Sequence, residues 1–290
     1  MLCSKEERVV KQALEGAGML ENSCNIQRIT ASMTNQLYSF MYSGKKYLVR
    51  IPGKGTEYLV NRQQETEVYT LLKGRGITDE VRYINAENGI KITEYLDHAH
   101  VCNMKDKDEI GACIRHLRKF HEMKLQIGHE FDVYQKIEEY EKQCGAIIIN
   151  LENYKNMRKK IIDLRKITDK QPREYCLCHI DPIADNFLIS GKNIYLIDWE
   201  YAAMCDPLID IAMFCIYSEL DKESTDRIID VYFDKCCMEE ERRKIYAYMA
   251  AGAFLWVLWA EIKRISGQNY EDYKKRQYAI AEEFYRYTVE

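Results

Sequence analysis

Apolar residues alternate with polar ones along most of the first hundred residues, which is the pattern of half-buried β-strands. An amphipathic helix is expected over residues 5–16 and a second helix over residues 56–73, where Gly74 ends the helical pattern. Turn signals such as Asn88-Gly89 separate the extended runs, so a small antiparallel sheet is predicted. The expected strands are 26–30, 37–42, 47–51, 81–84 and 90–95.

Helical periodicity replaces the β pattern from residue 106 onward, so the chain as a whole is expected to be an α+β protein. The apolar run 247–260 is shorter than the about 20 residues that cross a bilayer, and we expect a buried helix there without membrane insertion. One hairpin is predicted among the helices, with strands at 187–189 and 194–197 around Gly191. The expected helices are 108–122, 134–144, 152–167 and 239–266.

This hairpin carries the candidate chemistry. Asn186 precedes its first strand and Asp198 follows its second, so folding the hairpin brings the two residues side by side. Asp181 lies in the loop just before, with His179 two residues earlier. Kinases use this set: one aspartate receives the proton of the substrate hydroxyl, while an asparagine and a second aspartate hold Mg²⁺ on the nucleotide phosphates.

The spacing His179-x-Asp181-x-x-x-x-Asn186 alone arises by chance in roughly a few per cent of chains of this length. The alternative is a surface hairpin with ordinary polar turn residues. Such a turn does not require His179, nor an aspartate with a buried pattern, such as Asp198 directly after Tyr-Leu-Ile. The sequence therefore predicts phosphoryl transfer.

Residues 179–186, followed by Ile-Asp-Trp-Glu-Tyr-Ala at 197–202, resemble the choline/ethanolamine kinase family, within the aminoglycoside-phosphotransferase-like kinases. The likeness is greatest to bacterial choline kinases of the Lic type. It implies a bilobal, protein-kinase-like fold, with a nucleotide-binding lobe at 1–94, a catalytic and choline-binding lobe at 95–290, and the site in the cleft between them. ATP and Mg²⁺ are the implied cofactors.

The resemblance also implies residues for the nucleotide. Arg50 ends the third strand, where a protein kinase has lysine, and a guanidinium can hold phosphates there. Its partner is expected to be Glu65, because Asn61-Arg62-x-x-Glu65 is similar to the family pattern, although Glu67 is an alternative.

Two further segments are expected to contact the nucleotide. The loop 31–35 lies where kinases cover the phosphates, and Thr34 and Asn35 are its best candidates, although without the usual glycines it is as readily an ordinary turn. Glu94 and Leu96 lie in the segment that corresponds to the hinge, whose backbone recognises adenine.

Support for the catalytic loop is expected from buried polar groups. His179 is predicted to hold the loop by hydrogen bonding. Asp210 lies inside an apolar segment and needs a buried partner, for which the loop backbone is the obvious choice. Asp206 is expected to cap the same helix. For His121 we expect only a core role.

Aromatic residues near the C-terminus point to the acceptor. A quaternary ammonium has no hydrogen-bond donors and binds through apolar and π surfaces, whereas a primary amine would lose hydration there. An aromatic stripe on a helix is more often core, but beside a kinase motif it favours a choline site. The residues expected to line it are Trp199, Tyr201, Trp256, Trp259, Tyr270 and Tyr273.

The chain departs from the family pattern at one acceptor position. Relatives often place a glutamate facing the cation shortly after Asp210, whereas Tyr217 occupies that place here and Glu219 follows it. The charge partner of the cation is therefore Glu219, Glu200 or the metal aspartate Asp198 alone.

Composition limits the other possibilities. A net charge of −4 argues against a nucleic-acid partner. The 47% apolar and 30% charged residues are ordinary for a soluble protein, and no basic-then-apolar leader opens the sequence. Eleven cysteines without zinc or disulfide spacing fit free thiols, so a cytoplasmic location is expected. The oligomeric state stays open.

The predicted reaction is ATP- and Mg²⁺-dependent phosphorylation of choline, with Asp181 as base. The same chemistry on ethanolamine, thiamine or an aminoglycoside is an alternative, although an aminoglycoside site should be acidic and open. A catalytically silent nucleotide-binding module is a second alternative, supported only by the glycine-poor phosphate loop.

Overall fold

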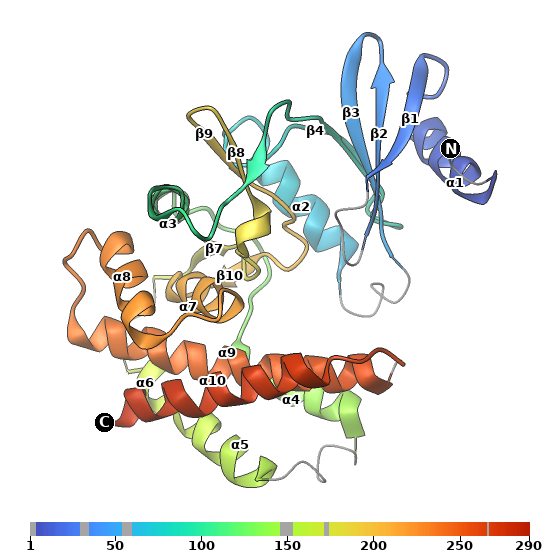
Figure 1. Ribbon diagram of the computed structural model, residues 1–290. Coiled ribbons are helices and arrows are strands. Elements are labelled where there is room, and N and C mark those ends of the chain that lie inside the picture. Colours follow the sequence, from blue (N-terminus) through green and yellow to red (C-terminus); the bar gives the residue numbers. More distant parts are fainter. Residues whose placement is uncertain (1–3, 30–34, 54–59, 146–152, 171–173, 266) are drawn as a thin grey trace. The chain divides into compact units, whose positions relative to one another are not determined.

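A computed structural model describes residues 4–29, 35–53, 60–145, 153–170, 174–265 and 267–290 (Figure 1). The chain forms two compact units, each described here by itself. The sheet unit comprises residues 1–102 and 185–202, and the helical unit comprises residues 103–184 and 203–290. These units differ from the lobes 1–94 and 95–290, which remain a prediction about function.

A five-stranded antiparallel sheet is the framework of the sheet unit. Ser43 and Gly44 make its tightest turn with φ values of 48° and 81°, as expected of a two-residue hairpin. Helix α1 (Ser4–Gly16) buries Val10 and Leu14 in the same apolar cluster as strand residues such as Phe40. The strands, in sheet order, are β1 (Ser23–Ile29), β2 (Gln36–Tyr42), β3 (Lys45–Ile51), β5 (Lys91–Glu94) and β4 (Val81–Ile84), close to the predicted runs.

Helix α2 (Arg62–Leu72) begins later than residue 56, where the sequence pattern placed its start. Asn61 has an extended backbone conformation and caps the helix, because its side chain accepts hydrogen bonds from Gln63 N and Gln64 N at 3.1 and 3.2 Å. The buried face of α2 includes charged residues, which an ordinary core helix would exclude.

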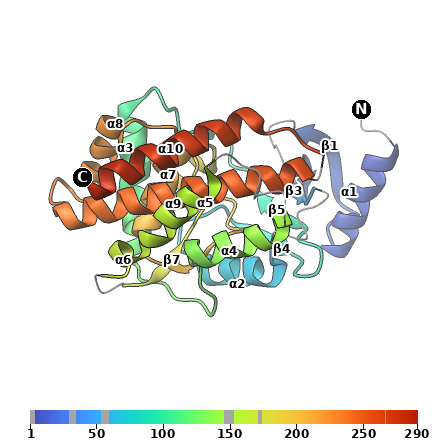
Figure 2. The same ribbon diagram turned by 90° about the horizontal axis from the view of Figure 1, so that it is seen from below.

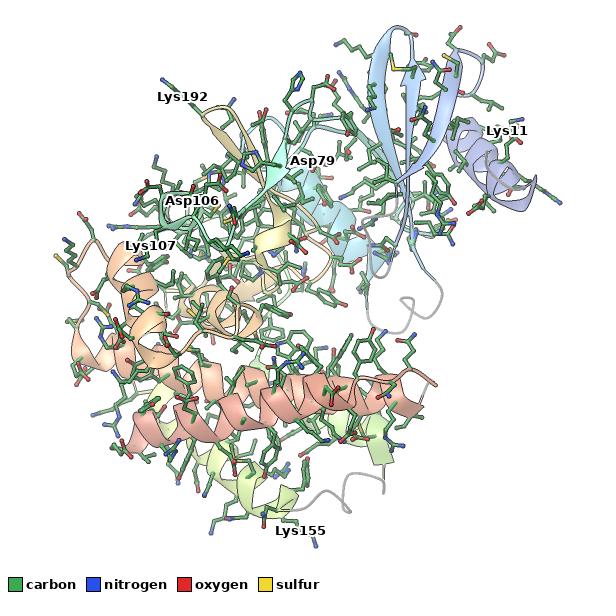
Figure 3. The ribbon with its side chains drawn as sticks, in the orientation of Figure 1. Lys11, Asp79, Asp106, Lys107, Lys155 and Lys192 are labelled. Carbon is green, nitrogen blue, oxygen red and sulfur yellow. The ribbon has the colours of Figure 1, made fainter. Side chains whose placement is uncertain are left out.

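The predicted hairpin is present in the sheet unit. β8 (Phe187–Ser190) pairs with β9 (Asn193–Leu196), with Phe187 opposite Leu196. Gly191 takes a φ of 61° in the turn, and Lys192 lies at its tip (Figure 3). A short strand not predicted from the sequence, β6 (His100–Val101), pairs with the other edge of β8.

The helical unit is arranged around one long helix, α9 (Glu239–Ile265), which runs beside α10 and also packs on α4 and α7 (Figure 2). The helix predicted over 152–167 is divided in two after Asp163. A two-stranded sheet, β7 (Cys176–Cys178) with β10 (Ala203–Cys205), and helix α8 were not predicted. The other helices are α3 (Lys107–Glu122), α4 (Val133–Cys144), α5 (Tyr154–Asp163), α6 (Arg165–Thr168), α7 (Leu208–Tyr217), α8 (Lys222–Tyr232) and α10 (Glu271–Val289).

Helix α9 is longer than the apolar run 247–260 that suggested it. Among the described residues it is the one helix long and apolar enough, by length and composition, to cross a membrane. Within its most apolar 18-residue window, 89% is buried inside the protein. Packing against neighbouring helices therefore accounts for its apolar surface.

The cysteines behave mainly as small core residues. Ten of them lie in the described part of the chain, all as free thiols, and seven of these are buried. Burial raises the pKa of the Cys205 thiol to about 11 and that of Cys215 to about 12, so these thiols stay protonated and unreactive at neutral pH.

Gly252 sets how closely α9 approaches α7, and substituting it tests this packing. A Cβ at this position would lie 2.9 Å from Ile216 Cδ1 and 3.1 Å from Met213 Cε. We expect Gly252→Leu to lower the free energy of unfolding by about 1–3 kcal/mol through overpacking. Gly252→Ala is the matched control and should stay within about 1 kcal/mol of wild type, since improved helix propensity offsets small side-chain shifts. Urea denaturation of the three proteins measures this, and equal losses for alanine and leucine would contradict it.

Candidate active site

At the open end of the hairpin, Asn186 directly precedes β8 and Asp198 follows β9, so both lie at the same end of the two strands. Ile197 N–H donates a 2.9 Å hydrogen bond to Asn186 O, which extends the ladder by one pair beyond β8 and β9. Asn186 is buried, whereas the side chain of Asp198 remains 30% exposed. Asp198 has a φ of 66°, a conformation that aspartate tolerates better than most residues, and the chain turns there.

Arg50 is the buried cation beside this end of the hairpin. Its Nη2 lies 2.6 Å from Glu65 Oε1 and its Nη1 lies 3.0 Å from Asp198 Oδ1. Nη2 also donates a 3.0 Å hydrogen bond to Gly89 O. Burial alone would lower the pKa of Arg50, but the Glu65 and Asp198 carboxylates outweigh it and raise the pKa. The predicted pairing of Arg50 with Glu65 is therefore present, and the guanidinium is permanently charged.

A second arginine, missed from the sequence, completes the charge cluster. Arg62 Nη1 lies 2.7 Å from Glu65 Oε2 and 3.0 Å from Glu200 Oε2. Arg50 Nη1 is 3.6 Å from the same Glu200 oxygen. Burial and the neighbouring Asp198 carboxylate raise the pKa of Glu200, against the two guanidiniums that lower it. The spacing of Arg62 and Glu65, one helical turn apart, could have indicated their ion pair. Glu200, the other partner of Arg62, is too distant in sequence for a local pattern to reveal it.

The oxygen ligands at the hairpin end fit Mg²⁺. A carboxylate and a carboxamide are the hard donors that this ion prefers, and Asn186 and Asp198 supply one of each. Glu65, Asp198 and Glu200 also have carboxylate oxygens within 4.8 Å of one another. Glu65, however, is enclosed by Arg50 and Arg62, so arginines already supply its countercharge. The fit is best for Asn186 with Asp198.

In the helical unit, Asp210 holds the loop that carries Asp181. Its fully buried carboxylate accepts hydrogen bonds from His179 N and Ile180 N, both at 2.7 Å. Ile180 has a φ of 70°, a strained conformation for a β-branched residue, which persists only when its surroundings enforce it. Asp210 thus has the loop-backbone partner expected from its buried position. Asp206 accepts a 3.0 Å hydrogen bond from Leu208 N, but Pro207 occupies the N-cap position of α7, so Asp206 precedes the cap and is not the cap itself.

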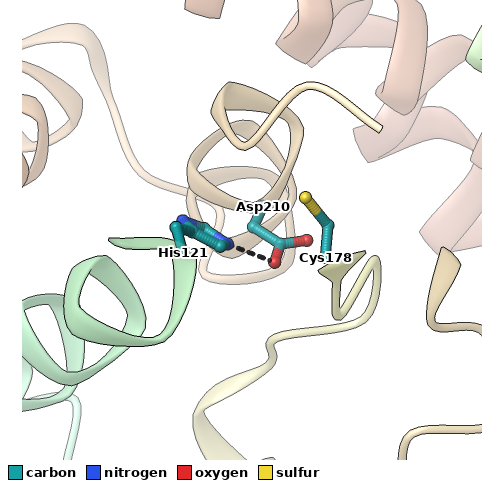
Figure 4. A group of neighbouring side chains, drawn as sticks. All are labelled: His121, Cys178 and Asp210. Atoms are coloured by element: carbon teal, nitrogen blue, oxygen red, sulfur yellow. Dashed lines mark hydrogen bonds and ion pairs between the residues drawn. The ribbon is translucent and has the colours of Figure 1, made fainter. Parts of the chain in front are cut away.

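His121 takes part in this support, which the sequence analysis did not foresee. Figure 4 shows its ring between α3 and α7, with Nε2 2.9 Å from Asp210 Oδ2. Its Nδ1 is 2.8 Å from the hydroxyl of Tyr232. Cys178 lies near enough for the three residues to suggest a metal site, but both Asp210 oxygens already accept backbone hydrogen bonds. The group is better explained as a hydrogen-bonded brace for the loop.

Aromatic residues of α7, α9 and α10 form one contiguous group in the helical unit. The ring centroids of Trp256 and Trp259 are 6.1 Å apart, and Trp259 lies 6.0 Å from Tyr273 and 5.0 Å from Tyr270. Tyr217 joins the group, 5.3 Å from Trp256. The position at which the family resemblance led us to look for a glutamate therefore contributes another ring.

This aromatic group lies within electrostatic reach of Asp181. Burial raises the pKa of Tyr273, and the carboxylates of Asp181 and Glu219 raise it further. Glu219 itself is exposed and pairs with Arg276, with 2.6 Å between Oε1 and Nε. Tyr273, which packs against Trp259, is therefore near enough to Asp181 for that carboxylate to contribute to its raised pKa.

Two predicted acceptor residues belong to the sheet unit. Trp199 is completely buried in the sheet unit, where its Nε1 donates a 2.7 Å hydrogen bond to Leu196 O. That environment is a core position, and we leave Trp199 out of the acceptor site. Tyr201 is half-buried in the sheet unit.

The remaining nucleotide residues are less informative. Thr34 lies outside the described residues, and Asn35 is buried at the edge of that segment. The Glu94 side chain accepts a 2.8 Å hydrogen bond from Arg82 Nε at the surface, and Leu96 is half-buried. That the backbone at Glu94 and Leu96 recognises adenine remains a prediction.

Comparison with known proteins places these features in a family. The family model described as choline/ethanolamine kinase matches residues 26–253. The crystal structure of choline kinase LicA from Streptococcus pneumoniae superposes with a TM-score of 0.84 at 29% identity, covering 98% of this chain and 100% of that one. A structure of LicA in complex with AMP gives 0.81 at 27% identity, covering 98% and 99%.

Other relatives extend the picture. Protein LicA of Haemophilus influenzae is 25% identical over 255 residues, which is 83% of this chain and 94% of the relative. The aminoglycoside phosphotransferase APH(4)-Ia is 15% identical with a TM-score of 0.70, covering 95% of this chain and 97% of that one, and shares the fold alone. The chain has the protein-kinase-like fold of these phosphotransferases, and it belongs to the choline/ethanolamine kinase family.

Proposed function

We propose that this protein transfers the γ-phosphoryl group of ATP to the hydroxyl of choline in the presence of Mg²⁺. The observation that carries the proposal is that one unit contains both the braced loop of Asp181 and the aromatic group around Trp259 and Tyr273. A base for the hydroxyl and a surface for a quaternary ammonium are the two things a choline kinase must provide.

The aromatic group suits a cation that cannot donate hydrogen bonds. Each ring facing a desolvated ammonium contributes about 0.5–2 kcal/mol by cation–π attraction. Trp256 is buried, whereas Trp259, Tyr270 and Tyr273 are partly exposed and available to a ligand. The nearby carboxylate of Glu219 is already paired with Arg276. A primary amine would therefore lose hydration with little hydrogen bonding in return, which favours choline over ethanolamine.

Asp181 is the proposed general base. Its carboxylate takes the hydroxyl proton as the choline oxygen forms a bond to the γ-phosphorus and the bond from that phosphorus to the β–γ bridging oxygen breaks, giving phosphocholine and ADP. The loop carrying Asp181 is fixed through its backbone by Asp210, which is itself held by His121. Holding the base in one position lowers the cost of reaching the reactive geometry.

The sheet unit supplies the proposed phosphate chemistry. Arg50 is permanently charged and held by Glu65, so it can hold nucleotide phosphates without reorganising. Asn186 and Asp198 are the residues that would hold Mg²⁺. When bound, the ion neutralises charge on the phosphates. The AMP complex of the relative LicA supports nucleotide binding in this part of the family.

Asp181→Asn tests the base. We expect turnover to fall by about 10²–10⁴-fold with little change in ATP affinity, because the amide cannot accept the hydroxyl proton but keeps the shape of the side chain. Asp185→Asn, an exposed change in the same loop, is the matched control and should keep near-normal turnover. ADP release and ATP titration calorimetry give the two readouts. A loss below about tenfold for Asp181→Asn would point to positioning rather than proton transfer.

The cation surface is tested at Trp259. Trp259→Leu should raise the KM for choline about tenfold, the effect of losing roughly one ring contact, while the KM for ATP stays constant. Trp259→Phe keeps an aromatic face and should lose less. Rates with choline, ethanolamine, thiamine and an aminoglycoside give the acceptor profile of each variant. Equal KM values for the leucine and phenylalanine variants would remove the cation–π argument, and ADP release with none of the four acceptors would favour a silent nucleotide-binding module.

A further inference from the structure

One face of α2 is directed at the segment that follows Asp198. Arg62, Glu65 and Tyr69 stand at positions i, i+3 and i+7, so they share that face, and all three are buried. The segment 198–200 meets this face within the sheet unit. Two charged residues on the buried face of a helix demand compensation, and the contacts show where it comes from.

Each of the three side chains engages this segment or the arginine bonded to it. Arg62 Nη1 binds Glu200 Oε2 at 3.0 Å, and Trp199 N–H donates to the Tyr69 hydroxyl at 3.4 Å. Glu65 acts through Arg50, which bonds Asp198. Contacts from α2 therefore hold both the backbone and the side chains of the residues that directly follow Asp198.

The space that the Arg62 side chain occupies depends on a glycine at position 89. Gly89 lies against its side chain, and a Cβ there would approach Arg62 Cδ and Nε to 2.5 Å. Gly89 also has a φ of 69°, and its carbonyl accepts the hydrogen bond from Arg50 Nη2. The turn that holds Arg50 thus also leaves room for Arg62.

The distances in the cluster show what Arg62 does. Glu200 Oε2 is 3.6 Å from Arg50 Nη1, the same nitrogen that bonds Asp198 Oδ1 at 3.0 Å. Two carboxylates therefore lie beside one Arg50 nitrogen, and Asp198 is the nearer of the two. Arg62 holds Glu200 at 3.0 Å and so leaves the Arg50 nitrogen to Asp198. Without Arg62, Glu200 would be drawn toward Arg50 and would displace Asp198.

We propose that Arg62 is a positioning residue for Asp198, acting by holding Glu200 away from Arg50. This inference rests on the proposed function, in which Asp198 holds the metal ion on the nucleotide. When a residue that orients a metal ligand without touching the metal is substituted, metal affinity or activity commonly changes by about 10–100-fold. A purely structural ion pair would change stability and leave metal affinity alone.

The test measures metal binding directly. Mn²⁺ binding in the presence of a non-hydrolysable ATP analogue, followed by electron paramagnetic resonance, should weaken about tenfold or more in Arg62→Met. The KM for choline should stay near the wild-type value. Arg62→Lys should recover part of the Mn²⁺ affinity, since an ammonium keeps the charge but lacks the rigid, planar fork of a guanidinium. Arg227→Met, which removes an exposed arginine paired with Glu223, is the control and should bind Mn²⁺ as wild type does.

A double variant separates positioning from independent effects. If Arg62 acts through Glu200, the Mn²⁺ affinity lost in Arg62→Met/Glu200→Gln is less than the product of the two single losses. Two outcomes would overturn the proposal. One is a loss of Mn²⁺ affinity in the double variant equal to the product of the two single losses, and the other is wild-type Mn²⁺ affinity in a folded Arg62→Met protein. Should Arg62→Met not fold, Arg62→Lys decides, and unchanged Mn²⁺ affinity there counts against it. Wild-type protein that binds the metal–nucleotide complex yet makes no phosphocholine would refute the function and leave this test valid.

Discussion

Burying an arginine requires carboxylates to be brought to it, and in the sheet unit this requirement organises the candidate site. Arg50 is 3% exposed, and its charge is retained because Glu65 and Asp198 offset the loss of hydration. Removing either partner would leave the buried guanidinium with weaker compensation. The strand, the helix α2 and the hairpin end are therefore tied together by one guanidinium, at the place where nucleotide phosphates are proposed to bind.

The helical unit also contains a buried charge that needs compensation, and this charge is negative. Asp210 is a buried carboxylate, and its compensation comes from two backbone N–H groups and from His121. Those backbone donors belong to the loop that carries Asp181, so satisfying a buried charge also fixes the candidate base. The left-handed conformation of Ile180 is the local cost of that arrangement, and the strong charge-assisted hydrogen bonds offset it.

Helix α9 combines packing with the proposed recognition of the acceptor. Most of its apolar surface is buried against neighbouring helices, with Gly252 allowing close approach to α7. Near its C-terminal end, Trp256 and Trp259 pack on Tyr217 and Tyr273 in place of aliphatic residues. A rigid core helix holds the rings in position before a ligand arrives, which reduces the ordering cost of binding.

Local periodicity, turn residues and a family motif were enough to predict the strands of the sheet, the hairpin between Asn186 and Asp198, and the pairing of Arg50 with Glu65. Only the tertiary structure decided that Arg62 meets Glu200 across 138 residues, that His121 meets Asp210 across 89, and that Trp199 is core. Contacts at such separations follow from how buried charges and volumes are satisfied together, and no local pattern encodes them.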